Sequence, residues 1–116
     1  MNIEVIRETI EELKNSDTSF DTCSKLASLY TVLSYMEEDV IVDELSDIFP
    51  AYQKYITAKR HYQTGDGSKE TVIDNLNLVC KEIYDFIKTL YSCTDMPLER
   101  IKIQNMIEAV NTEINY

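Results

Sequence analysis

Carboxylates that repeat along the predicted helices are the residues whose types and spacing could support catalysis. Glu8 with Glu11 or Glu12, and Glu82 with Asp85, lie three or four residues apart, which puts each pair on one face of a helix. Such pairs can hold Mg²⁺ in all-α nucleotide hydrolases. The fuller Glu-Glu-x-x-Glu pattern of those enzymes is absent from this sequence. Acidic helices produce these spacings by chance, so we expect neither a metal nor a cofactor.

Nucleophilic and metal-ligating side chains are few. The one histidine, His61, has no recognisable partners for a catalytic triad or a zinc site, and we expect it on the surface of a helix. Three widely spaced cysteines, Cys23, Cys80 and Cys93, argue against a disulfide framework. The last two share one predicted helix at a separation of about 20 Å, beyond disulfide reach. We expect all three to be small buried hydrophobic residues. The sequence therefore predicts a protein that is not an enzyme.

Negative charge is concentrated in the first half of the chain. Residues 1–51 carry 12 acidic and 3 basic side chains, against 9 and 8 in residues 52–116. The densest stretch consists of Glu37, Glu38, Asp39, Asp43, Glu44 and Asp47. One interpretation is a face that only keeps the protein soluble. The other is a surface that binds a basic protein, with carboxylates on a rigid helix standing in for DNA phosphates. The second is the hypothesis that we take forward.

A basic and aromatic cluster follows the acidic stretch. It consists of Tyr52, Tyr55, Lys59, Arg60 and Tyr62, with Lys54 and His61 beside them. Such residues can clamp single-stranded nucleic acid, but a net charge of -10 makes direct nucleic-acid binding unexpected. We expect the tyrosines to pack half-buried with their hydroxyl groups at the rim. A homo-oligomer contact between this cluster and the acidic stretch is an alternative.

The elements that must position these residues are predicted to be helices, because apolar residues recur every three or four positions nearly throughout. The expected helices cover residues 2–14, 21–37, 50–63, 68–92 and 97–115, with a short helix at 43–48. Asp21 and Ser68 are the expected N-caps of two of them. Residues 40–42 are expected to form an extended connector or the entry to the next helix. The prediction is a single all-α domain over residues 1–116, a bundle of four to five helices with a long central helix at 68–92.

The composition agrees with one compact domain. The chain has 116 residues, of which 44% are hydrophobic, and a pI near 4.4. No apolar run reaches the ~18 residues of a membrane span. The first residues lack the basic and apolar regions of a signal peptide. We therefore expect a cytoplasmic protein that has no membrane partner.

Three stretches carry a resemblance that spans most of the chain. They are Leu26–Tyr30, Pro50–Tyr55 with Ala58–Gln63, and Lys81–Ile87 with Thr89–Tyr91. In combination they resemble small helical proteins carried by phages and prophages of low-GC Gram-positive bacteria. No agreed activity comes with that group, so the resemblance implies no functional residues.

The resemblance implies a non-enzymatic role inside the host cell. One version is an acidic inhibitor or regulator of a basic, nucleic-acid-handling host protein, such as a defence inhibitor that mimics DNA. The other version is a structural or packaging accessory protein that forms a homo-oligomer.

Overall fold

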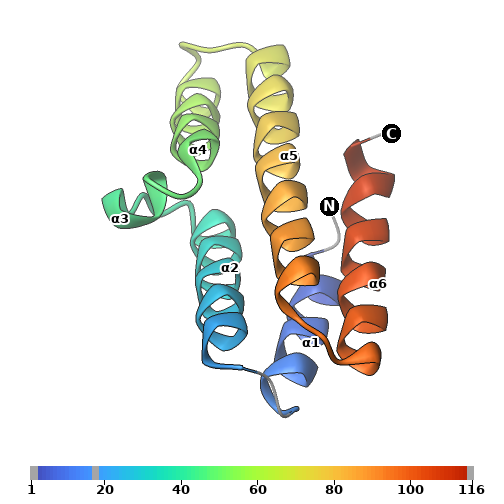
Figure 1. Ribbon diagram of the computed structural model, residues 1–116. Coiled ribbons are helices and arrows are strands. Elements are labelled where there is room, and N and C mark those ends of the chain that lie inside the picture. Colours follow the sequence, from blue (N-terminus) through green and yellow to red (C-terminus); the bar gives the residue numbers. More distant parts are fainter. Residues whose placement is uncertain (1–2, 17–18, 115–116) are drawn as a thin grey trace.

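The protein is a bundle of helices joined by short connections (Figure 1). The computed structural model describes residues 3–16 and 19–114. Its helices are α1 (Ile3–Lys14), α2 (Phe20–Glu38), α3 (Asp43–Ser46), α4 (Pro50–Gln63), α5 (Lys69–Cys93) and α6 (Pro97–Ile114). No strand occurs over these ranges. The predicted all-α fold is confirmed. The one-turn α3 is the short helix expected at 43–48, and residues 40–42 form the expected extended connector.

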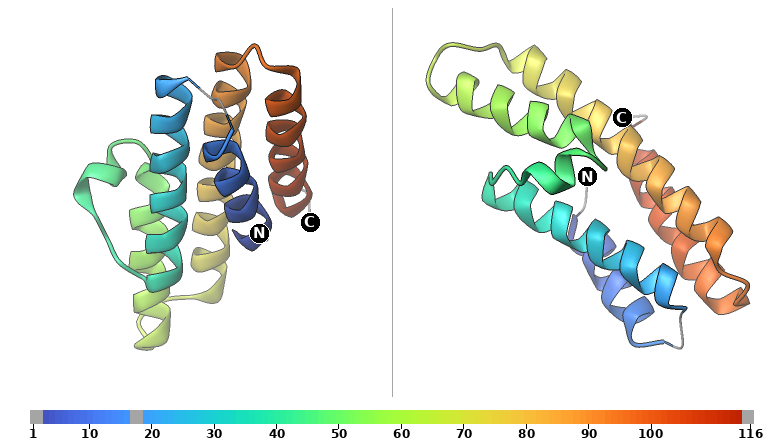
Figure 2. Two further views of the ribbon diagram at one scale, coloured as in Figure 1. Left: turned by 90° about the horizontal axis from the view of Figure 1, so that it is seen from below. Right: turned by 60° about the vertical axis from the view of Figure 1, so that its left-hand side comes forward.

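Helices α1, α2, α5 and α6 form a closed four-helix arrangement. Neighbours pack in the order α1, α2, α5, α6 and back to α1 (Figures 1 and 2). Each helix turns its apolar stripe inward, as the spacing of three and four residues predicts. The fully buried aliphatic side chains include Ile6, Ile10, Leu13, Leu26, Leu29, Leu33, Ile83, Ile87, Leu90, Ile103 and Val110. Helix α5 is central, as predicted, because α2, α4 and α6 all pack against it.

The hairpin formed by α4 and α5 projects beyond this bundle. Helix α4 follows α2 along the N-terminal half of α5 (Figure 1). Ile56 and Val79 are fully buried at the base of the hairpin, whereas no residue from 57 to 78 belongs to the buried core. We call residues 57–78 the distal hairpin. Because the distal hairpin projects, the molecule is elongated, with principal extents of 48 × 29 × 20 Å and a radius of gyration of 14.6 Å. A compact domain of this length has a radius of roughly 13 Å.

The turn of the distal hairpin depends on both glycines of the chain. Gly65 has a φ of +87°, which L-residues rarely adopt. A Cβ atom on Gly67 would lie 3.1 Å from the Cβ of His61. The turn predicted from the Gly-Asp-Gly sequence therefore needs glycine at both positions. Gly65 is needed for its backbone conformation, and Gly67 is needed for its close packing against His61.

The N-terminus of α2 differs from the prediction. Its N-cap is Ser19 and not Asp21, because the Ser19 hydroxyl accepts a hydrogen bond from the Thr22 amide at 3.3 Å. Asp21 lies in the first turn, where its charge favours the positive end of the helix dipole. The Ser68 prediction is confirmed, since its hydroxyl accepts from the Thr71 amide at 3.2 Å at the start of α5.

The N-terminus of α4 is capped by a side chain from another helix. Its N-cap residue, Phe49, makes no side-chain hydrogen bond, and Pro50 occupies the first turn. The carboxylate of Glu82 on α5 accepts the amide of Ala51 through both oxygens, at 3.0 and 2.9 Å. Glu82 therefore fixes the start of α4 against α5.

A second carboxylate joins the loop after α1 to the start of α6. Glu99 is only 3% exposed. It accepts hydrogen bonds from the hydroxyls of Thr94 at 2.7 Å and Ser16 at 3.1 Å. Because a buried carboxylate needs such donors, this contact holds the α1 and α6 ends of the bundle together.

Candidate protein-binding surface

The predicted acidic stretch spans the end of α2, the connector and α3. Glu37 and Glu38 are the last residues of α2, and Asp39 is its C-cap, with a φ of 56° in the left-handed region. Asp43 and Glu44 form the first turn of α3. Asp47 is the C-cap of α3. The stretch therefore lies along one corner of the molecule, where the chain passes from α2 to α4 (Figure 1).

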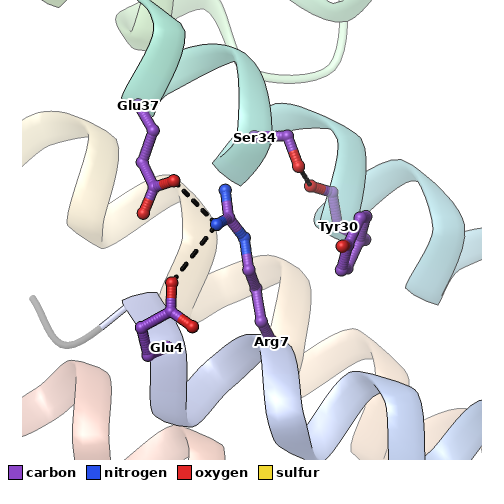
Figure 3. Close-up of polar contacts among 5 residues, drawn as sticks. All are labelled: Glu4, Arg7, Tyr30, Ser34 and Glu37. Atoms are coloured by element: carbon purple, nitrogen blue, oxygen red, sulfur yellow. Dashed lines mark hydrogen bonds and ion pairs between the residues drawn. The ribbon is translucent and has the colours of Figure 1, made fainter.

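Glu37 is paired within the chain. The Arg7 guanidinium on α1 donates to Glu37 at 2.7 Å and to Glu4 at 3.4 Å (Figure 3). The same guanidinium lies over the Tyr30 ring, 5.7 Å from its centroid. Arg7 is only 15% exposed at its side chain, so this network ties α1 to α2. Sequence analysis missed Arg7 because 30 residues separate it from Glu37.

Asp39 joins the acidic stretch to the basic cluster. Its carboxylate lies 2.8 Å from the Lys59 ammonium, and its backbone carbonyl accepts from the Arg60 guanidinium at 2.6 Å. The hydrogen bond to Asp39 raises the pKa of Lys59 above its ordinary value of 10.5, against the opposing effect of burial. The two charged clusters therefore meet within a single chain.

Besides the paired Glu37, four acids of the stretch are exposed: Glu38, Asp43, Glu44 and Asp47. In the described part of the chain, none of their side chains forms an ion pair or a hydrogen bond. Asp43 and Asp47 are four residues apart and Glu44 and Asp47 three apart, so these carboxylates share one side of α3. We call these four residues the acidic surface.

The backbone under the acidic surface is held firmly. Leu45 and Phe49 are 8% and 1% exposed, and the Phe49 ring packs on Phe86 with centroids 5.0 Å apart. The Tyr52 hydroxyl donates to the Val42 carbonyl at 2.6 Å and also contacts the Val42 amide. A short helix with little stability of its own is thus anchored on both sides.

The tyrosines of the basic cluster do not share one surface. Tyr52 is fully buried, so its predicted place in a partner-binding patch is wrong: its hydroxyl is used inside the fold instead of at the rim. Tyr55 is half-buried and packs against the core, as expected. Tyr62 is 47% exposed near the end of α4.

A groove of about 1080 Å³ runs between α4 and α5. Its lining comprises Ser46, Pro50, Gln53, Lys54, Thr57, Ala58, His61, Asp66, Gly67, Ser68, Thr71 and Asn75. We call it the α4–α5 groove. Half of the lining residues carry hydroxyl or amide groups, Lys54 and Asp66 bring one charge of each sign, and most of the lining surface is apolar. The predicted surface position of His61 is confirmed, and the groove was not predicted because it is made by residues far apart in sequence.

Two of the carboxylates weighed for catalysis have structural contacts. Glu12 lies 3.6 Å from Lys102 on α6, and Glu82 caps α4. Over residues 3–16 and 19–114 no group of three or more His, Cys, Asp or Glu is placed to hold a metal. Cys80 is buried as expected, but Cys93 is exposed and its sulfur lies 3.0 Å from the Lys25 ammonium, which corrects that prediction. Cys23 is half-buried.

Comparisons of the chain with protein-family models, with curated proteins and with solved structures find no match. The resemblance to phage-encoded helical proteins therefore stays a prediction. Within the two described ranges, no helix has both the length and the apolar composition that crossing a membrane requires.

Proposed function

We propose that the protein is a non-catalytic binding module whose acidic surface docks on a basic protein that handles nucleic acid. The observation that carries the proposal is the state of Glu38, Asp43, Glu44 and Asp47. They are exposed, they carry like charge, and over the described residues none of them forms an ion pair. Like charges held together cost free energy unless a partner supplies the opposite sign. A cationic protein surface supplies it.

The contacts of Glu37 and Asp39 support this chemistry. Both neighbours of the acidic surface already bind cationic side chains, at 2.7 Å from Arg7 and 2.8 Å from Lys59. A basic partner would present the same groups to the remaining four carboxylates. In the more specific form of the proposal, these carboxylates take the place of DNA phosphates in a Lys- and Arg-lined groove. The phage setting and the identification of the partner as a host protein rest on the resemblance alone.

Charge reversal tests the proposal. One variant replaces Glu38, Asp43, Glu44 and Asp47 with Lys. The matched control replaces four exposed acids elsewhere, Glu8, Glu11, Glu70 and Asp85, with Lys, so that the net charge changes equally. Circular dichroism checks that both variants keep their helices.

The measurement is capture of basic proteins from a low-GC Gram-positive lysate at about 0.15 M and about 1 M salt. We expect a basic protein that the wild type and the control retain, that the reversed variant loses, and that duplex DNA displaces. Salt at the higher concentration should release it, because the Debye length falls from ~8 to ~3 Å. Equal capture by the reversed variant would remove the acidic surface from the proposal.

A further inference from the structure

The α4–α5 groove presents a long face without net charge. Its lining follows α4 from Pro50 to His61, which corresponds to about 17 Å along the helix axis. Lys54 and Asp66 are the charged residues of this lining, so its formal charge is zero, and most of its surface is apolar. A groove of this length accommodates about three turns of a helix.

Exposed apolar side chains extend the groove on both helices. Ile48, two residues before Pro50, is 47% exposed, and Leu78 on α5 is 47% exposed as well. Leu78 comes three residues after Asn75, which lines the groove, and four before Glu82, which caps α4. These residues therefore share the side of α5 that faces α4. Among the described residues, none from α1, α2 or α6 lines the groove, so this side of the hairpin lacks a third helix.

The acidic surface adjoins one end of the groove. Ser46 belongs to α3 and also lines the groove, as does Pro50. Asp43, Glu44 and Asp47 surround Ser46 in sequence, are exposed, and form no ion pair over the described residues. An occupant that follows the groove therefore meets an uncharged face along α4 and α5 and a cluster of negative charge at the α3 end.

Helix α4 does not supply the cations that this cluster lacks. It is the one described helix with more bases than acids, and it carries Lys54, Lys59 and Arg60. Lys59 and Arg60 both contact Asp39, and neither belongs to the groove lining. Lys54 is balanced within the lining by Asp66. The positive charge that complements the acids of α3 therefore has to come from the occupant.

We propose that the α4–α5 groove binds an amphipathic helix of the basic partner. The apolar stripe of that helix lies in the groove, and its Lys or Arg side chains lie on the acidic surface. This inference rests on the proposed function and adds the form of the bound segment. The length of the groove corresponds to ~12 residues of helix. Helices that bind in grooves use apolar residues spaced by three and four, and the ion pairs at the α3 end fix the orientation.

A model peptide and two variants of the full chain test the inference. The probe is a fluorescein-labelled peptide of ~14 residues, with Leu and Ala along one helical face and Lys at one end of the other. The groove variant T57W/T71W places two large uncharged side chains at exposed positions of the lining. The control N77W/T89W makes the same change at two exposed positions of α5 outside the lining. Circular dichroism checks that both variants keep their helices.

Fluorescence anisotropy at about 0.15 M salt measures the dissociation constant of each complex. We expect the groove variant to bind the peptide at least about tenfold more weakly than the wild type, because the indole rings occupy the space of the helix. The control should bind like the wild type. The variant that replaces the acidic surface with Lys should also lose at least about tenfold, and a peptide with Glu in place of Lys should not bind.

Three results with the peptide would each overturn the inference. They are a wild type that does not bind the Lys peptide, a groove variant that binds it like the control, and equal binding of the Lys and Glu peptides. Because the groove variant keeps the acidic surface, the capture experiment separates this inference from the proposed function. A basic protein that the groove variant retains and the charge-reversed variant loses would leave the proposed function standing and overturn the helix in the groove.

Discussion

At the scale of single residues, Asp39 determines how the two charged clusters are arranged. It ends α2 in the left-handed conformation, which Asp and Asn tolerate better than most L-residues. Its own amide and that of Val40 both donate to the Tyr35 carbonyl, which closes the helix. Its carboxylate points to Lys59. One residue therefore serves as a helix end and as the link between the acidic stretch and α4.

The variant Asp39→Asn separates these two roles. Asn keeps the left-handed helix end but lacks the charge. We expect the pKa of Lys59 to fall toward its ordinary value of 10.5, because the hydrogen bond to Asp39 is the main cause that raises it. An NMR titration that follows the Lys59 side chain measures this shift. Asp47→Asn is the control and should leave the Lys59 pKa unchanged. A Lys59 pKa that does not move in the Asp39 variant would show that the contact is absent in solution.

The same ion pair predicts the pH dependence of stability. The pKa of Lys59 is raised in the folded state, so folding favours its protonated form. The resulting stabilisation is complete below the ordinary pKa of 10.5 and is lost as the pH rises through the higher folded value. Urea unfolding of the wild type and of Asp39→Asn should show a constant difference in unfolding free energy from neutral pH to pH ~9. That difference should shrink above pH ~10.5. A difference that grows with alkaline pH would contradict this assignment.

Tyr52 predicts a second effect at this scale. Tyr52→Phe removes the hydroxyl that bonds the part-buried Val42 backbone. The Val42 carbonyl keeps the Leu45 and Ser46 amides, whereas the Val42 amide loses the Tyr52 hydroxyl. We expect a loss of about 1–3 kcal/mol in unfolding free energy. Hydrogen exchange of the amides in residues 40–47 should accelerate locally. The exposed Tyr62→Phe is the matched control and should change neither quantity. Unchanged exchange in the Tyr52 variant would show that α3 is held by Leu45 and Phe49 alone.

At the scale of elements, the start of α4 depends on α5. The Glu82 carboxylate replaces the N-cap side chain that Phe49 cannot provide. Glu82→Ala should therefore lower the unfolding free energy by about 1–2 kcal/mol. Asp85→Ala removes an exposed carboxylate one turn further along the same helix and should cost much less. Chemical denaturation measures the unfolding free energy of both variants. Equal losses would mean that the Glu82 cap does not stabilise the fold specifically.

The sequence predicts the helices better than it predicts the contacts between them. Helical periodicity, Pro50, the glycine turn and Pro97 are local signals, and they place all the helices to within a few residues. The cap on α4 comes from Glu82, 31 residues beyond the amide that it accepts. Glu99 reaches Ser16 across 83 residues. Such contacts depend on which helices become neighbours, and no local pattern contains that information.

The same limit applies to the candidate surface. The run of charge is visible in the sequence, but whether each acid is free depends on distant cations. Arg7 forms an ion pair with Glu37, and Lys59 forms one with Asp39. The sequence-based prediction treated all six acids alike, whereas the structure separates two that are paired from four that form no ion pair or hydrogen bond over the described residues.

At the scale of the whole molecule, negative charge is concentrated in one part of the surface. Four unpaired acids lie on a short anchored helix and its flanks, next to the one cationic helix of the described chain. Natural surfaces gain solubility from scattered charge of both signs, whereas a one-sign cluster on a rigid support suits recognition of the opposite sign. We therefore propose that a basic partner binds at the acidic surface.

The most direct test is to map the contacts of the complex by NMR, using amide and side-chain signals of this protein and the basic protein that the capture experiment identifies. We predict that the largest shifts fall on Glu38, Asp43, Glu44 and Asp47, and that adding duplex DNA reverses them. A stable complex whose contacts leave all four residues unaffected would contradict the account.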